Sequence, residues 1–407
     1  MKNMPEIRFK GFTDAWVQRK LGEVFKQTVE YVNPKEEDIE LWSLTVESGL
    51  TPKTERYNRE FLVKKEDAFK VVLPDEFIYN PMNITLGSVD LNLTNKKVAV
   101  SGYYITMRTV ENHNNNYFAV WLKSPKAIKL YKLYATGGLL EKQRVQFPSL
   151  SQIETTIPVY KEQTAIGNFF RTLDSTIVLY KRKLDSLKQI KKAYLQQMFP
   201  QDGERVPKIR FAGFKGDWEV YTLGELGSTY TGLSGKTKED FGKGEAKYVT
   251  YLNILNNLLT NSEEMGAVEI DNKQNEVKYG DIFFTTSSET PEEVGMSSVW
   301  LHTLKNIYLN SFCFGFRPSR KVCPYYMAFM LRSPYVRVKI QLLAQGISRY
   351  NISKTKLMEI EINMPSLVEQ TAIGNFFRNL DEQITTQQTK LNNLKLLKSA
   401  YLQKMFV

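Results

Sequence analysis

The sequence predicts a mixed α+β protein with two related α/β domains, separated by two long helices that pair as an antiparallel coiled coil. Three observations lead to this prediction. A stretch of 38 residues occurs twice, a shorter opening stretch also occurs twice, and the segments between them contain short strand-like runs. We call these stretches the repeat helix, the opening segment and the variable segment.

The opening segment covers residues 5–24 and residues 207–226, which begin PEIRFKGF and PKIRFAGF. Ten of its twenty positions match at an offset of 202. The chain therefore reads opening, variable, helix, and then the same three parts again. A period near 200 residues indicates a duplicated domain rather than a short-repeat solenoid. The predicted division of the chain is 1–158, 159–200, 201–365 and 366–407.

The variable segments, residues 25–155 and 227–362, contain short β-branched or aromatic runs bounded by Gly, Pro or Asn, which are typical of strands. Each is expected to carry one helix, near residues 116–133 and 324–343. Ser124-Pro125 and Ser333-Pro334 can begin or interrupt these helices. We expect one fold with diverged surfaces. The predicted strands are 68–73, 76–79, 97–100 and 103–109, and then 247–250, 281–285, 298–301 and 312–317.

The repeat helix begins EQTAIGNFF in both copies, at residues 162–199 and 369–406. The two copies are identical at 24 of 38 aligned positions, with a constant offset of 207. Their apolar residues recur at alternating steps of four and three, which is the period of a coiled-coil seam. Such a helix cannot bury its seam alone, so we expect it to pair with the other copy. The seam positions of the first copy are Ile166, Phe170, Leu173, Ile177, Tyr180, Leu184, Leu187, Lys191, Tyr194 and Met198.

The net charge of +11 and the pI near 9.2 favour a polyanionic partner, such as nucleic acid. No apolar run approaches the roughly 20 residues that cross a membrane, and the first residues contain no signal-peptide core. The two cysteines are too few for a disulfide framework. We therefore expect a cytoplasmic protein without a membrane partner.

No stretch of the sequence forms a complete catalytic or metal-binding motif. Residues 232–237 end in Gly-Lys-Thr like a P-loop, but Tyr230 stands where that pattern needs its first glycine. Residues 80–83 read NPMN and lack the second proline and the aromatic residue of an amino-methyltransferase motif. His113 and His302 are not at metal-ligand spacing. These observations predict no catalytic residues and no metal site.

Polar and basic turns in the variable segments are candidates for DNA contact. Examples are residues 56–59 and 95–97 and the turns that follow Gly137-Gly138 and Gly346. Lys and Arg bind phosphates, whereas Arg, Asn and Gln can also read base edges. A solvated surface loop is the competing interpretation of each turn. The predicted DNA-contacting residues are Lys142, Arg144, Arg349 and Tyr350 after the glycines, and Lys236 and Thr237 in the Gly-Lys-Thr loop.

The order of segments, the PEIRFKGF opening and the EQTAIGNFF helices closely resemble the specificity subunits of bacterial type I restriction–modification enzymes. The resemblance covers the whole chain. It implies that the variable segments are target-recognition domains, each reading one half of a bipartite DNA site. The repeat helices would set the distance between the half-sites and dock the modification subunits. Because the two variable segments differ, the DNA target is expected to be asymmetric.

The resemblance also implies partners and cofactors. Double-stranded DNA, two modification subunits and the restriction subunits are the expected partners. S-adenosylmethionine, ATP and magnesium are expected on the partner subunits and none in this chain. Two other interpretations stay open, a self-sufficient DNA methyltransferase or nuclease and a coiled-coil adaptor that does not bind DNA. The predicted docking residues, repeated outside the seam, are Gln163, Phe169, Gln370 and Phe376, although the phenylalanines could instead pack on their own domain.

Overall fold

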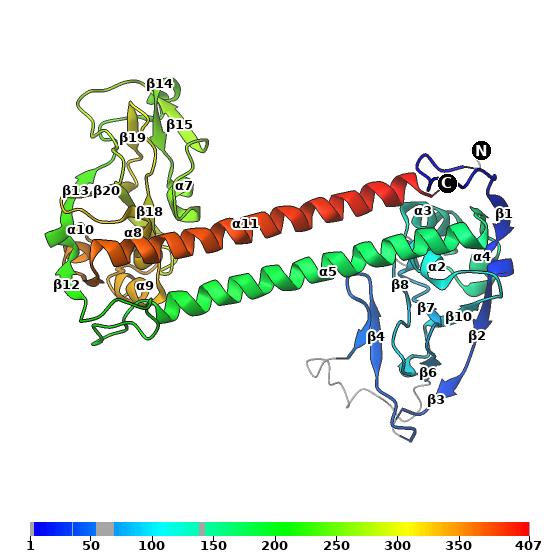
Figure 1. Cartoon of the computed structure of the whole chain (residues 1–407). Coiled ribbons are helices and arrows are strands. Elements are labelled where there is room, and N and C mark those ends of the chain that lie inside the picture. Colours follow the sequence, from blue (N-terminus) through cyan, green and yellow to red (C-terminus); the bar gives the residue numbers. More distant parts are fainter. Residues whose placement is uncertain (1–3, 35, 54–68, 138–142, 407) are drawn as a thin grey trace. The chain divides into compact units, whose positions relative to one another are not determined.

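The computed structural model describes residues 4–34, 36–53, 69–137 and 143–406. The chain forms two compact units, unit 1 from residues 1–181 and 389–407 and unit 2 from residues 182–388. Each unit thus combines one variable segment with parts of both repeat helices. The long helices are α5 (Tyr160–Gln197) and α11 (Leu367–Lys404), labelled in Figure 1.

Unit 1 contains short strands and short helices in addition to its parts of α5 and α11. Its strands are β1 (Val17–Lys20), β2 (Phe25–Thr28), β3 (Tyr31–Val32), β4 (Trp42–Thr45), β5 (Gly49–Pro52), β6 (Phe69–Val72), β7 (Phe77–Tyr79), β8 (Val89–Leu91), β9 (Val98–Ser101), β10 (Ile105–Thr109) and β11 (Glu154–Ile157). Its helices are α1 (Leu21–Val24), the 3-10 helix η3 (Ile84–Leu86), α2 (Asn115–Trp121), α3 (Pro125–Tyr134) and α4 (Phe147–Ser151).

Unit 2 contains a corresponding set of elements. Its strands are β12 (Glu219–Thr222), β13 (Gly227–Thr231), β14 (Phe241–Val249), β15 (Met265–Val268), β16 (Ile282–Thr285), β17 (Ser287–Ser288), β18 (Ser297–Val299), β19 (Ile307–Leu309), β20 (Cys313–Pro318), β21 (Tyr350–Asn351) and β22 (Glu361–Met364). Its helices are α6 (Leu223–Leu226), the 3-10 helix η5 (Lys238–Asp240), α7 (Tyr251–Asn256), α8 (Pro324–Leu331), α9 (Pro334–Gln341) and α10 (Lys354–Met358).

The two units share the topology of their four-stranded sheet. A four-stranded antiparallel sheet has the order β2-β10-β7-β8 in unit 1 and β13-β20-β16-β18 in unit 2. In both units the strand after the opening segment, β2 or β13, lies at the edge of this sheet. It pairs with the strand that precedes α2 in unit 1 or α8 in unit 2. A two-stranded pair, β1-β11 or β12-β22, joins the opening segment to the strand just before the long helix. The prediction that the variable segments have one fold is therefore confirmed.

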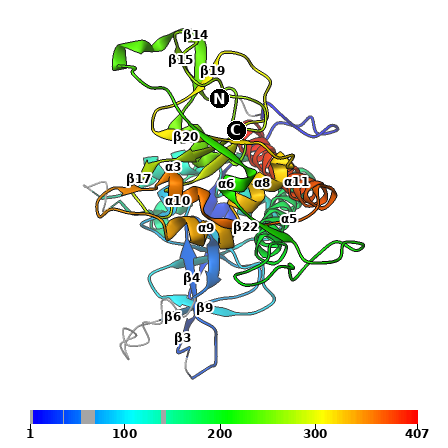
Figure 2. The same ribbon diagram turned by 90° about the vertical axis from the view of Figure 1, so that its left-hand side faces the viewer.

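The second sheet differs between the units. In unit 1 the order β3-β6-β9 is antiparallel throughout. In unit 2, β14 pairs antiparallel with β15 and parallel with β19, and these three strands lie together in Figure 2. The register of β14 shifts between Phe241 and Ala246, which indicates an irregularity that bends a strand. The units thus diverge in this sheet while they keep the four-stranded sheet.

The helix predicted in each variable segment is in fact two helices. In unit 1 the break falls between α2 and α3, and in unit 2 between α8 and α9. The second helix of each pair begins with the proline of a Ser-Pro step. The Ser124 hydroxyl accepts a hydrogen bond from the Ala127 N–H at 3.2 Å, as an N-cap does. Proline lacks an N–H and fits the first turn, so it starts a new helix instead of continuing the old one.

Within each unit the two long helices are antiparallel and contact each other. In unit 1 the Phe169 and Tyr401 rings are 5.0 Å apart, and Lys398 Nζ lies 2.5 Å from Asp174 Oδ1. Unit 2 repeats the ion pair with Lys191 and Asp381, also at 2.5 Å. The predicted seam positions of the first copy are buried or half-buried. Because the lysines occupy seam positions, these reciprocal ion pairs help to set the antiparallel register.

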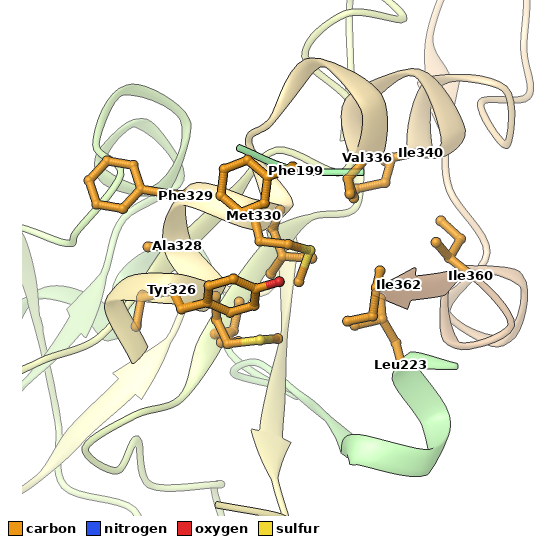
Figure 3. Close-up of a cluster of buried hydrophobic side chains, with 14 of the residues drawn as sticks. Phe199, Leu223, Tyr326, Ala328, Phe329, Met330, Val336, Ile340, Ile360 and Ile362 are labelled. Carbon is orange, nitrogen blue, oxygen red and sulfur yellow. The ribbon is translucent and has the colours of Figure 1, made fainter. Parts of the chain in front are cut away.

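The end of each repeat helix completes a core formed by the other copy of the repeat. Phe199, two residues after α5, contacts Tyr326 in the unit 2 core (Figure 3). Its ring also stacks on that of Phe377. Phe406, at the end of α11, stacks on Phe170 in the unit 1 core. A backbone hydrogen bond from Ile7 N–H to Lys404 O, 3.1 Å long, continues this packing into the opening segment of unit 1.

A glycine in each long helix allows close packing on α2 in unit 1 and on α8 in unit 2. A Cβ at Gly167 would lie 2.6 Å from the Tyr117 nitrogen of α2. A Cβ at Gly374 would lie 2.9 Å from the Tyr326 nitrogen of α8. Both neighbouring atoms belong to backbone, which cannot move aside as a flexible side chain does. The glycine of the EQTAIGNFF motif therefore permits a helix–helix contact that any larger residue would disturb.

Replacing Gly374 by alanine tests this contact. Glycine to alanine inside an exposed helix stabilises a protein by about 0.5–1 kcal/mol, but overpacking here should destabilise unit 2 by about 1–3 kcal/mol. Urea unfolding followed by tryptophan fluorescence measures the change. The exposed Ser186→Ala in α5 serves as the control, with a small stabilisation expected from helix propensity. A stabilised Gly374→Ala variant would contradict the assigned close contact.

Candidate nucleic-acid interface and helix anchor

Backbone hydrogen bonds join the residues that flank the turn after the glycine in both units, and in unit 2 they close a loop. In unit 2, Gln345 and Asn351 exchange two backbone hydrogen bonds of 2.9 and 2.8 Å. In unit 1, Thr136 and Arg144 exchange two bonds of 2.9 Å. Gly346 has a φ of +137°, and a Cβ there would clash with the Arg349 carbonyl oxygen. The chain therefore needs glycine at this place to turn back on itself.

The described residues among the four predicted in these turns differ in exposure. Arg144 and Arg349 are exposed, and the Arg144 guanidinium lies 6.0 Å from the centroid of the Tyr103 ring. Tyr350 instead belongs to β21, pairs with Ser288 and packs against the unit 2 core. Its side chain is half-buried, and its contact with DNA stays a prediction. Lys142 lies outside the described residues.

The Gly-Lys-Thr loop of unit 2 is internally bonded. Lys236 Nζ lies 2.8 Å from Asp271 Oδ2. The hydrogen bond from Lys236 is the main reason that the pKa of the Asp271 carboxyl falls to about 2. The Thr237 N–H donates to Asp240 Oδ2 at 2.7 Å, at the start of η5. Contact of these two residues with DNA stays a prediction, and Lys236 already has an anionic partner.

The two glutamines predicted to dock a partner anchor the long helices to the variable segments. Both are buried. Gln163 Oε1 accepts from the Asn114 N–H at 2.9 Å, and Gln370 Oε1 accepts from the Cys323 N–H at 3.0 Å. Asn114 and Cys323 are the N-cap residues of α2 and α8. Their polar atoms are thus engaged inside their own units, and docking of a partner by these glutamines stays a prediction.

The two predicted docking phenylalanines are half-buried and also pack inside their own units. The ring of Phe169 lies 5.7 Å from that of Phe9, and the ring of Phe376 lies 5.7 Å from that of Phe211. Phe9 and Phe211 occupy the same position of the two opening segments. These contacts favour the alternative in which the phenylalanines hold the opening segment against the long helix.

The opening segment is held to the long helix by a buried ion pair, which the sequence did not predict. Arg8 donates from Nε and Nη2 to the two carboxylate oxygens of Glu162, at 2.6 and 2.8 Å. Arg210 does the same with Glu369, at 2.7 and 2.8 Å. The hydrogen bond to Glu162 is the first cause of a raised pKa of the Arg8 guanidinium. Both glutamates are buried, so each pair is a two-bond lock between distant parts of the chain.

A signal for these pairs was present in the sequence. Arginine recurs in both opening segments and glutamate begins both repeat helices. A basic and an acidic residue duplicated together are candidates for a conserved contact. Their separation in the chain, 154 residues for Arg8 and Glu162, left no local spacing to connect them.

The comparisons with known proteins agree with this organisation. The family model described as the type I restriction modification DNA specificity domain matches residues 215–396. The MjaVIII type I restriction enzyme specificity subunit of Methanocaldococcus jannaschii is 23% identical over 286 residues, which are 60% of this chain and 61% of the relative. This chain is similar to type I restriction–modification specificity subunits.

Solved structures of specificity subunits share the fold. The S subunit from M. genitalium has a TM-score of 0.59 and 14% identity, over 99% of both chains. The HsdS subunit from Thermoanaerobacter tengcongensis has a TM-score of 0.50 and 15% identity, over 96% of both chains. These likenesses confirm the predicted fold class. The alignments to the first two curated relatives span 48% and 61% of those proteins' own lengths.

None of the helices in residues 4–34, 36–53, 69–137 and 143–406 is long and apolar enough to cross a membrane. The same part of the chain contains no group of three or more His, Cys, Asp and Glu residues that could hold a metal ion.

Replacing Arg8 by alanine tests the anchor. The change leaves Glu162 buried without its partner, which should destabilise unit 1 by about 3 kcal/mol. Hydrogen exchange of the unit 1 amides measures the loss, and the unit 2 amides provide an internal reference. The matched control is Arg19→Ala, which removes an exposed ion pair with Glu23 and should cost less than about 1 kcal/mol. Equal effects of the two substitutions would contradict the anchoring role.

Proposed function

We propose that this chain is the DNA-reading, non-catalytic specificity subunit of a type I restriction–modification complex. Each unit would read one half of a bipartite, asymmetric DNA site. The observation that carries the proposal is a duplicated fold whose variable segments have diverged while its helix anchors are the same. The family supplies the DNA-recognition component of type I systems, and the net charge of +11 suits a polyanionic partner.

Two reading units in one chain increase affinity without further contacts. Once one unit holds its half-site, the binding of the second unit becomes an intramolecular event. The long helices would then set the distance between the half-sites, as the spacing of a dimeric repressor does. Two different variable segments in this arrangement select two different half-sites, so the target would not be palindromic.

The repeat helices also offer a surface for two copies of one partner. Several exposed positions are identical in both copies, and the set from α5 lies in unit 2 while the set from α11 lies in unit 1. We propose that each set docks one modification subunit and that the restriction subunits join this assembly. S-adenosylmethionine, ATP and magnesium would then bind the partner subunits. The exposed identical pairs are Lys183 and Lys390, Lys188 and Lys395, Ala193 and Ala400, and Gln196 and Gln403.

Binding to labelled random duplex DNA, measured by fluorescence anisotropy across a salt series, tests the proposed function. The affinity should fall linearly with salt on a log–log plot, because binding to phosphates releases counterions. A flat response without salt-dependent binding would favour an adaptor that does not bind DNA. In a parallel assay the purified chain alone should transfer no methyl group from S-adenosylmethionine to DNA. Methyl transfer without a partner subunit would contradict the non-catalytic role.

A further inference from the structure

Unit 2 contains a recess of about 360 Å³ beside the closed loop that follows Gly346. Arg349 from that loop lines it, together with the carboxylates of Glu289 and Glu293. Leu252 of α7 and Phe312, just before β20, are further lining residues. The recess therefore combines a hydrogen-bond donor that is always charged, two acceptors and two apolar side chains.

The charged groups of the recess have free hydrogen-bonding capacity. Arg349 and Glu289 are exposed, and the ion pairs found between described residues include neither of them. Glu293 already accepts a hydrogen bond from the Ser288 hydroxyl at 2.8 Å. Arg349 and Glu289 are therefore the donor and the acceptor that an incoming ligand can use.

The apolar side chains in and beside the recess are largely exposed to solvent. The exposed fraction is 63% for Leu252 and 59% for Phe312, and Ile347 of the closed loop is 96% exposed. Leu252 and Phe312 line the same recess, and exposed apolar side chains that gather in one patch mark binding sites. They would exclude water from the polar contacts of a ligand, which strengthens those contacts.

A buried arginine holds residues 292–295, the segment that carries Glu293 and lies three residues after Glu289. The Arg337 guanidinium donates to the carbonyl oxygens of Gly295, Glu292 and Val294, at 2.7, 2.8 and 2.9 Å. No ion pair between described residues includes Arg337, and burial lowers its pKa to about 10. A buried charge used only for backbone carbonyls fixes the shape of this wall of the recess before a ligand arrives.

The chemistry of the recess distinguishes between parts of a DNA duplex. Phosphates would be repelled by the two carboxylates, so the recess does not suit the DNA backbone. In the major groove, guanine offers two acceptors to arginine, and cytosine offers an amino donor to a carboxylate. A recess with one free guanidinium and one free carboxylate therefore complements a G·C pair better than an A·T pair. An A·T pair is read best by Asn or Gln, which can both donate to and accept from adenine.

We propose that this recess reads the major-groove edge of one G·C base pair in the half-site recognised by unit 2. Arg349 donates to guanine O6 and N7, Glu289 accepts from cytosine N4, and Phe312 and Leu252 shield both contacts from water. Arg337 is a positioning residue that holds the glutamate-bearing segment. The inference rests on the proposed function, because it assigns a specificity-determining site within it.

Selection of bound sequences from a random duplex library tests this site in the chain assembled with its modification subunits. The variants are Arg349→Ala, Arg349→Lys and Glu289→Gln, and Arg205→Ala is the control, an exposed arginine of unit 2 outside the recess. Arg349→Ala should reduce the preference for G·C at one position by about fivefold to a hundredfold. Arg349→Lys should keep only part of the preference for G·C, because lysine carries the positive charge but lacks the planar fork of arginine.

The remaining positions of the selected sequence separate the outcomes. Glu289→Gln should weaken the preference at the same base pair, and the control should change none. An Arg349→Ala variant that keeps every base preference, or that binds all sequences equally less well, overturns the G·C assignment while the proposed function stands. If the unsubstituted complex selects no sequence at all, the proposed function itself fails.

Discussion

The buried ion pair between the opening segment and the start of the long helix is the constraint on which the rest of the structure depends. It occurs twice, as Arg8 with Glu162 and as Arg210 with Glu369. Next to each glutamate, a glutamine accepts a hydrogen bond from the N-cap residue of α2 or α8. A glycine further along the long helix leaves room for the backbone of that short helix. Four residue types in fixed order thus attach a variable segment to a long helix. This explains why the motif is identical in the two copies.

This anchor leaves the variable segments free to diverge. The four-stranded sheet that contacts the anchored elements keeps one strand order, whereas the second sheet changes from antiparallel to partly parallel. The recess with Arg349 and Glu289 lies in a variable segment, where no residue of the anchor is needed. A protein that reads two different DNA half-sites needs its DNA-contacting residues to be separate from the residues of the anchor. The DNA-contacting surface can then change without destabilising the contact between the variable segment and the long helix.

Much of the fold could be predicted from local patterns. The coiled-coil seam follows from apolar residues at 3.5-residue spacing, and the strands at 77–79 and 105–109 follow from short β-branched and aromatic runs. The contacts between distant segments could not be predicted in this way. Arg8 has no local relation to Glu162, and Gln163 looked like a surface residue because its buried partner is a backbone N–H far along the chain. The Ser-Pro steps were recognised, but only the structure shows that they divide each helix in two.

The central claim, that each unit reads its own half-site, is tested most directly by exchanging one variable segment. Residues 227–362 would be replaced by the equivalent segment of another specificity subunit. The variant would be expressed with the cognate modification subunit, and methylated sites would be mapped by long-read sequencing. The account predicts that one half of the methylated sequence changes while the other half stays the same. A change in both halves, or in neither, would contradict it.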